Sequence, residues 1–247
     1  MLAQSARDSA VTIGFSTKSY FSAEQTLKWL HHVGGHECGE SLQTFIVPSF
    51  PVLYQARQAL PPRMLLGAQD CSAQAPGAHT GEVSAQMLSE IGVSFVELGH
   101  AEHRRRGDTD DVIREKVAQA QSHGLDVLLC VGEHDRQGAQ TAAAECVNQI
   151  RSSGVDWNRC VIAYEPVWAI GAEAPAQSEH IAQTVSEIKA TLGPDSPLVI
   201  YGGTAGPGLL EEIYPSVDGL FLGRRAHDPE AFCATTLEAE GLIRAQP

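Results

Sequence analysis

The stretch Val161-Ile162-Ala163-Tyr164-Glu165-Pro166 shows the pattern that decides the fold. Its first four residues are apolar or aromatic, as is typical of a short buried strand, and an acidic residue and a proline follow directly. Further along, the stretch from Ser178 to Leu192 carries apolar side chains at three- and four-residue intervals, which predicts an amphipathic helix. A short strand, a polar residue at its end and a helix therefore form one structural unit.

This unit recurs along the chain. Seven more short apolar runs predict strands: Val11 to Phe15, Thr44 to Val47, Met64 to Ala68, Phe95 to Gly99, Val127 to Val131, Leu198 to Tyr201 and Leu220 to Leu222. Three more periodic stretches predict helices: Ser22 to Val33, Asp110 to His123 and Gln137 to Ser152. This alternation predicts an eight-stranded parallel β/α barrel rather than a β-sandwich. Because no linker or low-complexity segment interrupts it, we expect a single domain over residues 1–247.

The composition indicates a large core and an acidic surface. Hydrophobic residues make up 43% of the chain, and 17 Lys and Arg stand against 30 Asp and Glu, for a formal net charge of −13. This charge argues against nucleic acid or an anionic membrane as a partner, because both need a basic surface. No segment approaches the roughly 18 uninterrupted apolar residues of a membrane helix, and residues 1–10 lack a signal-peptide core, so we expect a cytoplasmic location.

The cysteines and histidines do not show the spacing of a metal site. Six cysteines are scattered without a Cys-x-x-Cys pair: Cys38, Cys71, Cys130, Cys146, Cys160 and Cys233. We therefore expect buried free thiols rather than a zinc site or a disulfide framework. Of the ten histidines, His31, His32 and His36 lie close together, but in a polar stretch, and we expect no bound metal.

Polar residues and glycines follow six of the eight predicted strands. They are Lys18 after the first strand, His100 and Glu102 after the fourth, Glu133 after the fifth, Glu165 after the sixth, Gly202-Gly203-Thr204 after the seventh and Gly223-Arg224 after the eighth. The loops at the C-terminal ends of the strands build the active site in a β/α barrel, so we expect these residues to meet at one rim.

Several segments of the chain resemble the triosephosphate isomerase family. The stretch Ala163-Tyr164-Glu165-Pro166-Val167-Trp168-Ala169-Ile170-Gly171 resembles the catalytic strand and lid of that family. Four more segments appear in the family's order and at similar spacing: Thr80 to Ser84, Leu98 to Glu102, Cys130 to Glu133 and Tyr201 to Thr204. The resemblance covers nearly the whole chain and implies a cofactor-free isomerase of phosphorylated sugars.

The resemblance also implies a role for each of four polar residues. Moving a proton between adjacent carbons needs a base, and Glu165 would abstract the carbon-bound proton. His100 would be the electrophile, in the neutral form for which this same family is the standard example. Lys18 would stabilise the negative charge of the enediolate and the phosphate, and Glu102 would contact Lys18 or relay protons.

Phosphate binding is expected to rest on the backbone more than on side chains. Gly171, Gly203-Thr204 and Gly223-Arg224 are the places where backbone N–H groups can approach an anion closely. The resemblance makes Pro166 to Ala176 a lid that includes Pro166, Val167, Trp168, Ala169 and Ile170, with Trp168 at its hinge and Ile170-Gly171 at its tip. It further implies that the Tyr201 hydroxyl bonds the backbone near Ala176 when the lid is closed, and that Glu133 holds Trp168 in one of the two states of the lid. No cofactor is implied.

The segment from Ala73 to Val83 resembles the loop through which two subunits of the family interdigitate. In that arrangement Thr80 would reach the active site of the neighbouring subunit. We therefore expect a homodimer.

The chain departs from the family's pattern at positions near the expected pocket. The family usually shows Asn-Trp-Lys after the first strand, whereas this chain has Ser16-Thr17-Lys18, which leaves room beside the substrate. Ala101 stands for a serine, and Arg224 stands for the second glycine of a Gly-Gly pair. A guanidinium at this rim can grip the phosphate or turn outward to a carboxylate.

Glu97 is unexpected inside an apolar strand. Alternation along the strand suggests that its side chain points opposite to Leu98 and His100, toward the helices. An unpaired buried carboxylate is unfavourable there, so we expect a cationic partner among Arg104 to Arg106.

Three functions are weighed from these residues. The leading one is triosephosphate isomerase, which interconverts glyceraldehyde 3-phosphate and dihydroxyacetone phosphate, because Lys18, His100 and Glu165 are all present. The alternative is an isomerase of a four-carbon ketose phosphate such as erythrulose phosphate, favoured by Ser16, Ala101 and Arg224. A non-catalytic sugar-phosphate-binding paralogue is the third. A dehydrogenase is disfavoured, because no Gly-x-Gly-x-x-Gly follows a strand.

Overall fold

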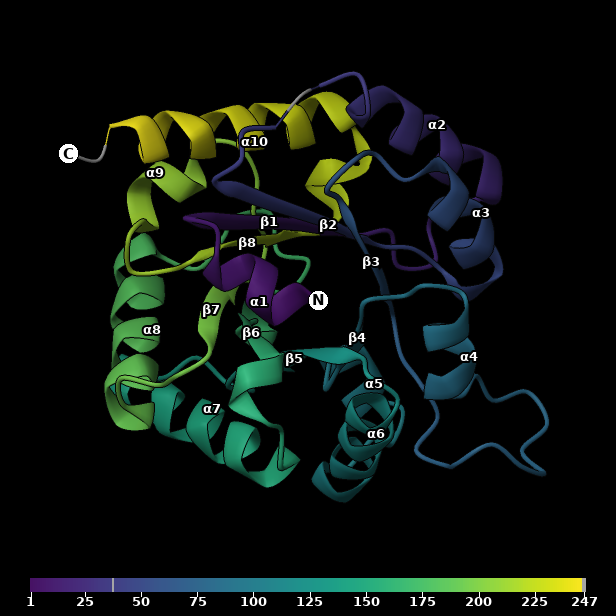
Figure 1. The fold of residues 1–247 in the computed structure, drawn as a ribbon. Helices are drawn as coiled ribbons and strands as arrows, with labels where there is room; N and C mark the ends of the chain where they lie inside the picture. Colours follow the sequence, from purple (N-terminus) through teal and green to yellow (C-terminus); the bar gives the residue numbers. More distant parts are fainter. Residues whose placement is uncertain (37, 246–247) are drawn as a thin grey trace.

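Eight parallel strands close into one barrel in the computed structural model, which describes residues 1–36 and 38–245. The strands are β1 (Val11–Ser16), β2 (Leu42–Val47), β3 (Leu65–Ala68), β4 (Phe95–Leu98), β5 (Asp126–Val131), β6 (Cys160–Tyr164), β7 (Leu198–Tyr201) and β8 (Gly219–Leu222). Each strand pairs with the next, and β1 also pairs with β8, so the sheet has no free edge. The predicted barrel is confirmed, with every predicted strand within two residues of its place (Figure 1).

Helices surround the barrel. They are α1 (Leu2–Arg7), α2 (Ala23–Val33), α3 (Leu53–Ala59), α4 (Ala85–Glu90), α5 (Ala101–Arg104), α6 (Asp110–Ser122), α7 (Ala139–Ser153), α8 (Ser178–Leu192), α9 (Leu209–Ile213) and α10 (Pro229–Arg244). Four short 3-10 turns join them: η1 (Phe50–Val52), η2 (Trp157–Arg159), η3 (Val167–Ala169) and η4 (Arg224–His227). The four predicted helices correspond to α2, α6, α7 and α8. The remaining helices were not predicted, and most of them are short.

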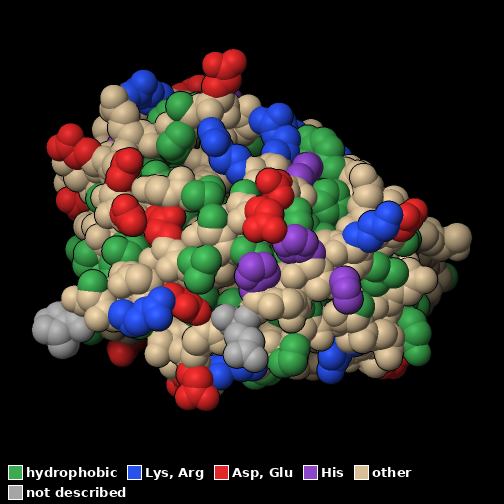
Figure 2. All heavy atoms as spheres, turned by 90° about the horizontal axis from the view of Figure 1, so that it is seen from above, with side chains coloured by type: hydrophobic (Ala, Val, Ile, Leu, Met, Phe, Trp, Pro, Cys, Tyr) green, Lys and Arg blue, Asp and Glu red, His purple; other side chains and the backbone are tan. Residues whose placement is uncertain are grey.

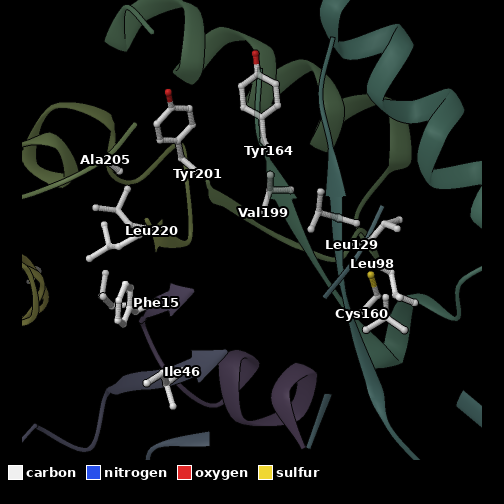
Figure 3. Close-up of a cluster of buried hydrophobic side chains, with 14 of the residues drawn as sticks. Phe15, Ile46, Leu98, Leu129, Cys160, Tyr164, Val199, Tyr201, Ala205 and Leu220 are labelled. Atoms are coloured by element: carbon white, nitrogen blue, oxygen red, sulfur yellow. The ribbon is translucent and has the colours of Figure 1, made fainter. Parts of the chain in front are cut away.

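Side chains pack on both faces of the barrel wall. One layer lies between strands and helices and includes Phe15, Ile46, Leu98 and Tyr201 (Figure 3). A second layer fills the barrel interior, where the rings of Phe45, Phe95 and Phe221 meet. Small residues on neighbouring strands make room for these rings: a Cβ at Gly14 would lie 1.9 Å from Phe45, and one at Gly67 would lie 2.3 Å from Phe95.

The short helix α1 closes the N-terminal end of the barrel. Leu2, Ala3 and Ala6 are at most 1% exposed and pack with the interior layer, and Figure 1 shows α1 lying across this end. The backbone N–H of Ala3 donates to Asp126 Oδ2 at 2.9 Å, and Arg159 holds the other oxygen of that carboxylate at 3.2 Å. With this end filled, the C-terminal ends of the strands are left for a site.

The structure also bears on the predictions for the cysteines and for membrane-spanning helices. All six cysteines are free, five of them buried and Cys38 half-buried, which confirms the expected thiols. No helix in residues 1–36 and 38–245 is long and apolar enough to cross a membrane. The cytoplasmic location stays a prediction.

Candidate active site

A cavity of about 660 Å³ opens at the C-terminal ends of the strands. Its lining comes from the loops after β1, β4, β6, β7 and β8, which are far apart in the sequence. The structure brings together there every catalytic and phosphate-binding candidate named from the sequence: Ser16, Lys18, His100, Glu102, Glu165, Gly171, Gly203, Thr204, Gly223 and Arg224. Ile170 of the lid also faces this cavity. The other lid candidates, Pro166 to Ala169, lie outside the lining and form the hinge.

Glu165 lies at the end of β6, with its side chain inside the cavity. It is 3% exposed, and its Oε2 has no hydrogen-bond partner among the described residues although His100 Nε2 lies 3.3 Å away. Burial, and then the charge of Glu97, raise the pKa of the Glu165 carboxyl well above its ordinary value. A carboxylate with raised proton affinity and a free oxygen can accept a proton from carbon.

His100 is the N-cap residue of helix α5 and is held in one orientation. Its Nδ1 accepts a hydrogen bond from the backbone N–H of Glu102 at 3.1 Å. A ring nitrogen that accepts carries no proton, so the proton of the neutral imidazole sits on Nε2, which faces Glu165 and Lys18. Burial, and then the charge of Lys18, lower the pKa of His100 to about 3, so the ring donates as a neutral imidazole.

Lys18 follows β1 in a left-handed backbone conformation, with φ of 45°. This strained conformation is stabilised at its carbonyl, which accepts from Gln69 Nε2 at 2.9 Å and from Ser49 Oγ at 3.3 Å. The ammonium lies 2.8 Å from Glu102 Oε1 and 3.3 Å from His100 Nε2. Burial opposes its charge, but the hydrogen bond to Glu102 and the charge of Glu165 outweigh burial and raise the pKa of Lys18. Lys18 therefore brings a permanent positive charge to the site.

Glu97 lies inside the barrel, not on the helix side, so the predicted orientation was wrong. Its Oε2 lies 3.4 Å from Ser16 Oγ, its Oε1 lies 4.0 Å from Cys130 Sγ, and it lines the cavity. The predicted partner was also wrong: Arg104 bonds the Gly99 carbonyl and Asp110 instead. All of β4 is buried, since helices cover one face and the interior layer the other, and burial therefore does not reveal which side chains point inward.

The lid lies closed over the cavity. The Tyr201 hydroxyl accepts a hydrogen bond from the backbone N–H of Ala176 at 3.3 Å, and Trp168 Nε1 donates to Glu133 Oε1 at 2.8 Å. Both contacts are those that the family resemblance implied. His180 and Tyr164 also hold Glu133, which is fully buried. The hinge is thus anchored on β6, β7 and α8.

The tip of the lid is held by the loops after β7 and β8. Thr204 Oγ1 lies 3.1 Å from the Ala169 carbonyl and 3.2 Å from the Ala172 carbonyl. Arg224 donates to the Gly171 carbonyl at 2.8 Å, and Arg225 donates to the Glu173 carbonyl at 3.1 Å. The Arg224 guanidinium therefore does not point outward to a carboxylate, and it is not unpaired in the cavity. Because the Thr204 side chain faces the lid, only its backbone is available to a phosphate.

Glycines allow close packing around the reacting carboxylate and the predicted phosphate site. A Cβ at Gly202 would lie 2.6 Å from Glu165 Oε1, and one at Gly203 would lie 2.2 Å from the Tyr201 hydroxyl. Gly171 has a φ of 75°, a conformation that favours glycine. Gly202, expected at the rim from the sequence, lines the cavity, whereas sequence reasoning missed Phe221 and Arg105 as lining residues. Arg105 lies in a run of three arginines that gives no means of choosing among them.

Among the residues that the structure describes, two groups of side chains have the composition of a metal site. Asp70 and Asp108 lie with His103, but both carboxylates bind the Lys116 ammonium, at 2.8 Å and 2.7 Å. The second group is His32, His36 and Cys233, on a face where histidines gather (Figure 2). His32 already pairs with Glu230 at 2.9 Å, and burial raises the pKa of the Cys233 thiol to about 11. Neither arrangement is that of free ligands.

Comparison with known proteins finds a family match and several similar isomerases. The family model described as triosephosphate isomerase matches residues 11–239. An L-erythrulose-1-phosphate isomerase of Pectobacterium atrosepticum is 41% identical and aligns over 93% of this chain and 95% of its own. A protein of the same name from Mesorhizobium japonicum is 34% identical, over 89% and 93%. A triosephosphate isomerase of Ruegeria pomeroyi is 36% identical, over 78% and 83%.

Proposed function

This chain belongs to the triosephosphate isomerase family, and we propose that it is a sugar-phosphate isomerase whose substrate is a four-carbon ketose phosphate such as L-erythrulose 1-phosphate. The observation that carries the choice of substrate is the 41% identity to an L-erythrulose-1-phosphate isomerase over 93% of this chain. The triosephosphate isomerase of Ruegeria pomeroyi aligns over 78% of it. This reverses the order expected from the sequence, in which the triose phosphate was the leading substrate.

The reaction follows from the structure of the substrate. L-Erythrulose 1-phosphate carries its phosphate on C1, its carbonyl on C2 and hydroxyls on C3 and C4. C3 is the carbon beside the carbonyl that bears a hydroxyl, so a base removes the C3 proton and an enediol forms between C2 and C3. Return of a proton to C2 and loss of the C3 hydroxyl proton leave the carbonyl on C3. The product is a ketose phosphate with the same atoms.

Glu165 is the base in this proposal. Its free Oε2 faces the cavity, and the surrounding burial raises its proton affinity, as removal of a proton from carbon requires. The same carboxyl then returns the proton to the neighbouring carbon. Because Gly202, which follows β7, has no side chain, its backbone can lie close behind this carboxylate. The close backbone restricts the position of the carboxylate.

His100 and Lys18 stabilise the negative charge that develops on the enediolate oxygens. His100 presents an N–H at Nε2, and the Lys18 ammonium lies 3.3 Å from that atom, so both donors converge on one point. In a closed cavity such donors stabilise an oxyanion strongly, because water does not compete with them. Glu102 orients Lys18 through their 2.8 Å ion pair. This chemistry needs no cofactor.

The phosphate is proposed to bind where Gly171, Gly203, the Thr204 backbone and Gly223 meet. These loops follow β6, β7 and β8, with Glu97 on β4 across the closed barrel from β8, and they offer backbone N–H groups to an anion. The Arg224 bridge to Gly171 connects the loop after β8 to the lid, so phosphate binding and lid closure are linked.

We also propose a homodimer in which the loop from Ala73 to Val83 enters the partner. Residues 74–82 are exposed, and the loop projects from the barrel between β3 and α4 (Figure 1). Its base is fixed by the 2.8 Å hydrogen bond from Ser72 N to the Val83 carbonyl. Beside the active site an open cavity of about 90 Å³, lined by Gln69, Glu102 and His103, has room for a side chain from such a loop.

The second candidate is triose phosphate as the substrate. The same base, electrophile and cation serve a three-carbon substrate, and triosephosphate isomerases are among the relatives. The test is kcat/KM of the purified protein on L-erythrulose 1-phosphate and on dihydroxyacetone phosphate, with Glu165→Gln as the control. We expect a clear preference for the four-carbon substrate that is lost in the variant. A preference for the triose would select the second candidate, and binding without turnover of either would select the non-catalytic paralogue.

A further inference from the structure

Glu97 is a buried carboxyl that the isomerase chemistry does not use. The base, the electrophile and the cation are Glu165, His100 and Lys18, yet Glu97 lies in the same cavity and is 4% exposed. Within the described residues no cation lies within ion-pairing distance of it. Its neighbours are Ser16 Oγ at 3.4 Å and Cys130 Sγ at 4.0 Å, both long contacts. Burying a carboxyl with such weak partners is unfavourable, so a ligand that binds it would supply what the protein lacks.

The position of Glu97 places it away from the phosphate. The phosphate loops follow β6, β7 and β8, whereas the Glu97 side chain points into the barrel interior from β4, which lies across the closed barrel from β8. Ser16 lies at the end of β1, beside β8, and its Oγ is 3.4 Å from Glu97 Oε2. A substrate held by its phosphate at those loops, with its reacting carbons at Glu165 and His100, extends its remaining end toward Glu97.

A four-carbon ketose 1-phosphate has one group there that a triose phosphate lacks. Up to C3 the two substrates have the same order of phosphate, carbonyl and hydroxyl-bearing carbon. The difference is a hydroxymethyl group, C4 and its oxygen, in place of one hydrogen on C3. Ser16 stands where the family usually has asparagine, whose side chain is two heavy atoms longer. The space left free matches the two heavy atoms that the larger substrate adds.

The chemistry of Glu97 also suits a hydroxyl. Burial is the main cause that raises the pKa of this carboxyl, to about 8, against an opposing effect of Lys18 and with a further rise from Glu102. Near neutral pH the group is therefore mostly protonated. A protonated carboxyl has one O–H donor and one free carbonyl acceptor, the pair that a hydroxyl complements.

We propose that Glu97 and Ser16 form a specificity subsite that binds the C4 hydroxymethyl group of the substrate. The proposal rests on the four-carbon substrate proposed above. The C4 hydroxyl donates to one Glu97 oxygen and accepts from the other or from Ser16 Oγ. Because a hydroxyl-binding site left empty keeps its polar groups unpaired, the same residues also disfavour the triose.

The experiment compares L-erythrulose 1-phosphate with its 4-deoxy analogue, which keeps all four carbons but lacks the C4 hydroxyl. We expect the wild-type protein to prefer the hydroxylated substrate by about 10- to 100-fold in kcat/KM, the range for the loss of the two hydrogen bonds that the C4 hydroxyl makes. In Glu97→Leu this preference should fall to near one, and Glu97→Gln, which keeps a donor and an acceptor, should retain part of it. Ser16→Asn should instead reduce kcat/KM on both four-carbon compounds relative to dihydroxyacetone phosphate.

The matched control is Glu115→Leu, the same change at an exposed position on α6, which should keep the wild-type preference. An unchanged preference in Glu97→Leu, in a protein that does turn over L-erythrulose 1-phosphate, overturns the subsite alone. A loss of the same size on all three substrates also overturns it, because that is the result of a purely structural role. A wild-type protein inactive on L-erythrulose 1-phosphate overturns the proposed function and the subsite together.

Discussion

Arg224 donates a 2.8 Å hydrogen bond to the carbonyl of Gly171, so the loop after the last strand holds the tip of the lid that follows β6. The two residues are brought together by the closure of the barrel. A Cβ at Gly171 would lie 3.3 Å from the Arg224 guanidinium, so the contact is also close in space. The bond ties the lid tip to the loop after β8, and moving the tip away from that loop would break it.

Replacing Arg224 should weaken lid closure. Arg224→Ala removes an exposed hydrogen bond whose charged donor contributes about 1 kcal/mol, so we expect kcat/KM to fall about 3- to 10-fold. Steady-state kinetics measure this change. Arg151→Ala, an exposed arginine on α7, is the control and should behave as the wild type. Equal kinetics for both variants would show that the tip is held without Arg224.

Tyr201→Phe tests the hinge of the lid. The variant keeps the buried ring in its layer but removes the hydroxyl that accepts from the Ala176 N–H at 3.3 Å. We expect a fall in kcat/KM of about 3- to 10-fold, as for the loss of one hydrogen bond, with little change in the midpoint of thermal unfolding. A large drop in that midpoint with normal kinetics of the folded fraction would instead assign the hydroxyl a role in stability.

His100 should remain neutral over the whole physiological range. Burial, and then the charge of Lys18, lower its pKa to about 3, so no histidine titration should appear in kcat/KM between pH 5 and pH 8. Nitrogen-15 NMR of labelled histidine measures the protonation directly and should report an Nε2–H tautomer at pH 5. A resonance from His100 that shifts with a midpoint near 6.5 would contradict this assignment.

Glu97 should make the protein less stable as the pH rises. The pKa of Glu97 is about 8 in the folded protein against an ordinary value of 4.5, so between these values the unfolded chain has lost a proton that the folded chain keeps. The free energy of unfolding therefore falls as pH increases through this window, by up to about 1.4 kcal/mol per pH unit from this group. Lys18, Glu102, Glu165 and Asp70 are the charged groups that act on it or share its cavity.

Urea denaturation of wild type and Glu97→Gln at one protein concentration measures this effect. The variant cannot lose a proton, so its stability advantage should be small at pH 5 and grow toward pH 8. A difference that stays constant over this range would mean that Glu97 titrates near its ordinary value. The same carboxyl would then carry a charge at neutral pH, and the donor role proposed for it would fail.

Leu2→Ala tests the closure of the barrel by α1. Leu2 is fully buried in the interior layer, and its truncation should lower the free energy of unfolding by about 2 to 5 kcal/mol. Leu237→Ala, at a position that is 58% exposed on α10, should change it by less than about 0.5 kcal/mol. Chemical denaturation measures both. The site lies at the other end of the barrel, so kcat/KM of the folded variant should be unchanged.

The sequence predicted the residues of the site more completely than it predicted the helices. Strand ends in a β/α barrel share one rim, so placing Lys18, His100 and Glu165 after their strands was enough to bring them together. The short helices α1, α3, α4, α5 and α9 have seven residues or fewer, too few for a helical period to stand out. The contact between Arg224 and the lid was missed, because an arginine side chain reaches partners that depend on the shape of the loops around it.

The amino-acid sequence by itself determined the β/α class, because apolar runs that alternate with amphipathic helices bury their side chains in a parallel sheet covered by helices. The count of eight runs, together with the segments that resemble the triosephosphate isomerase family, indicated the closed barrel. The sequence also determined which residues reach the rim. Only the tertiary structure decided which way Glu97 points. Every residue of β4 is buried, and on a strand covered on both faces hydrophobicity does not distinguish inward from outward. The closed barrel settles it, because Phe95 and Glu97 share the interior face and Leu98 packs toward the helices.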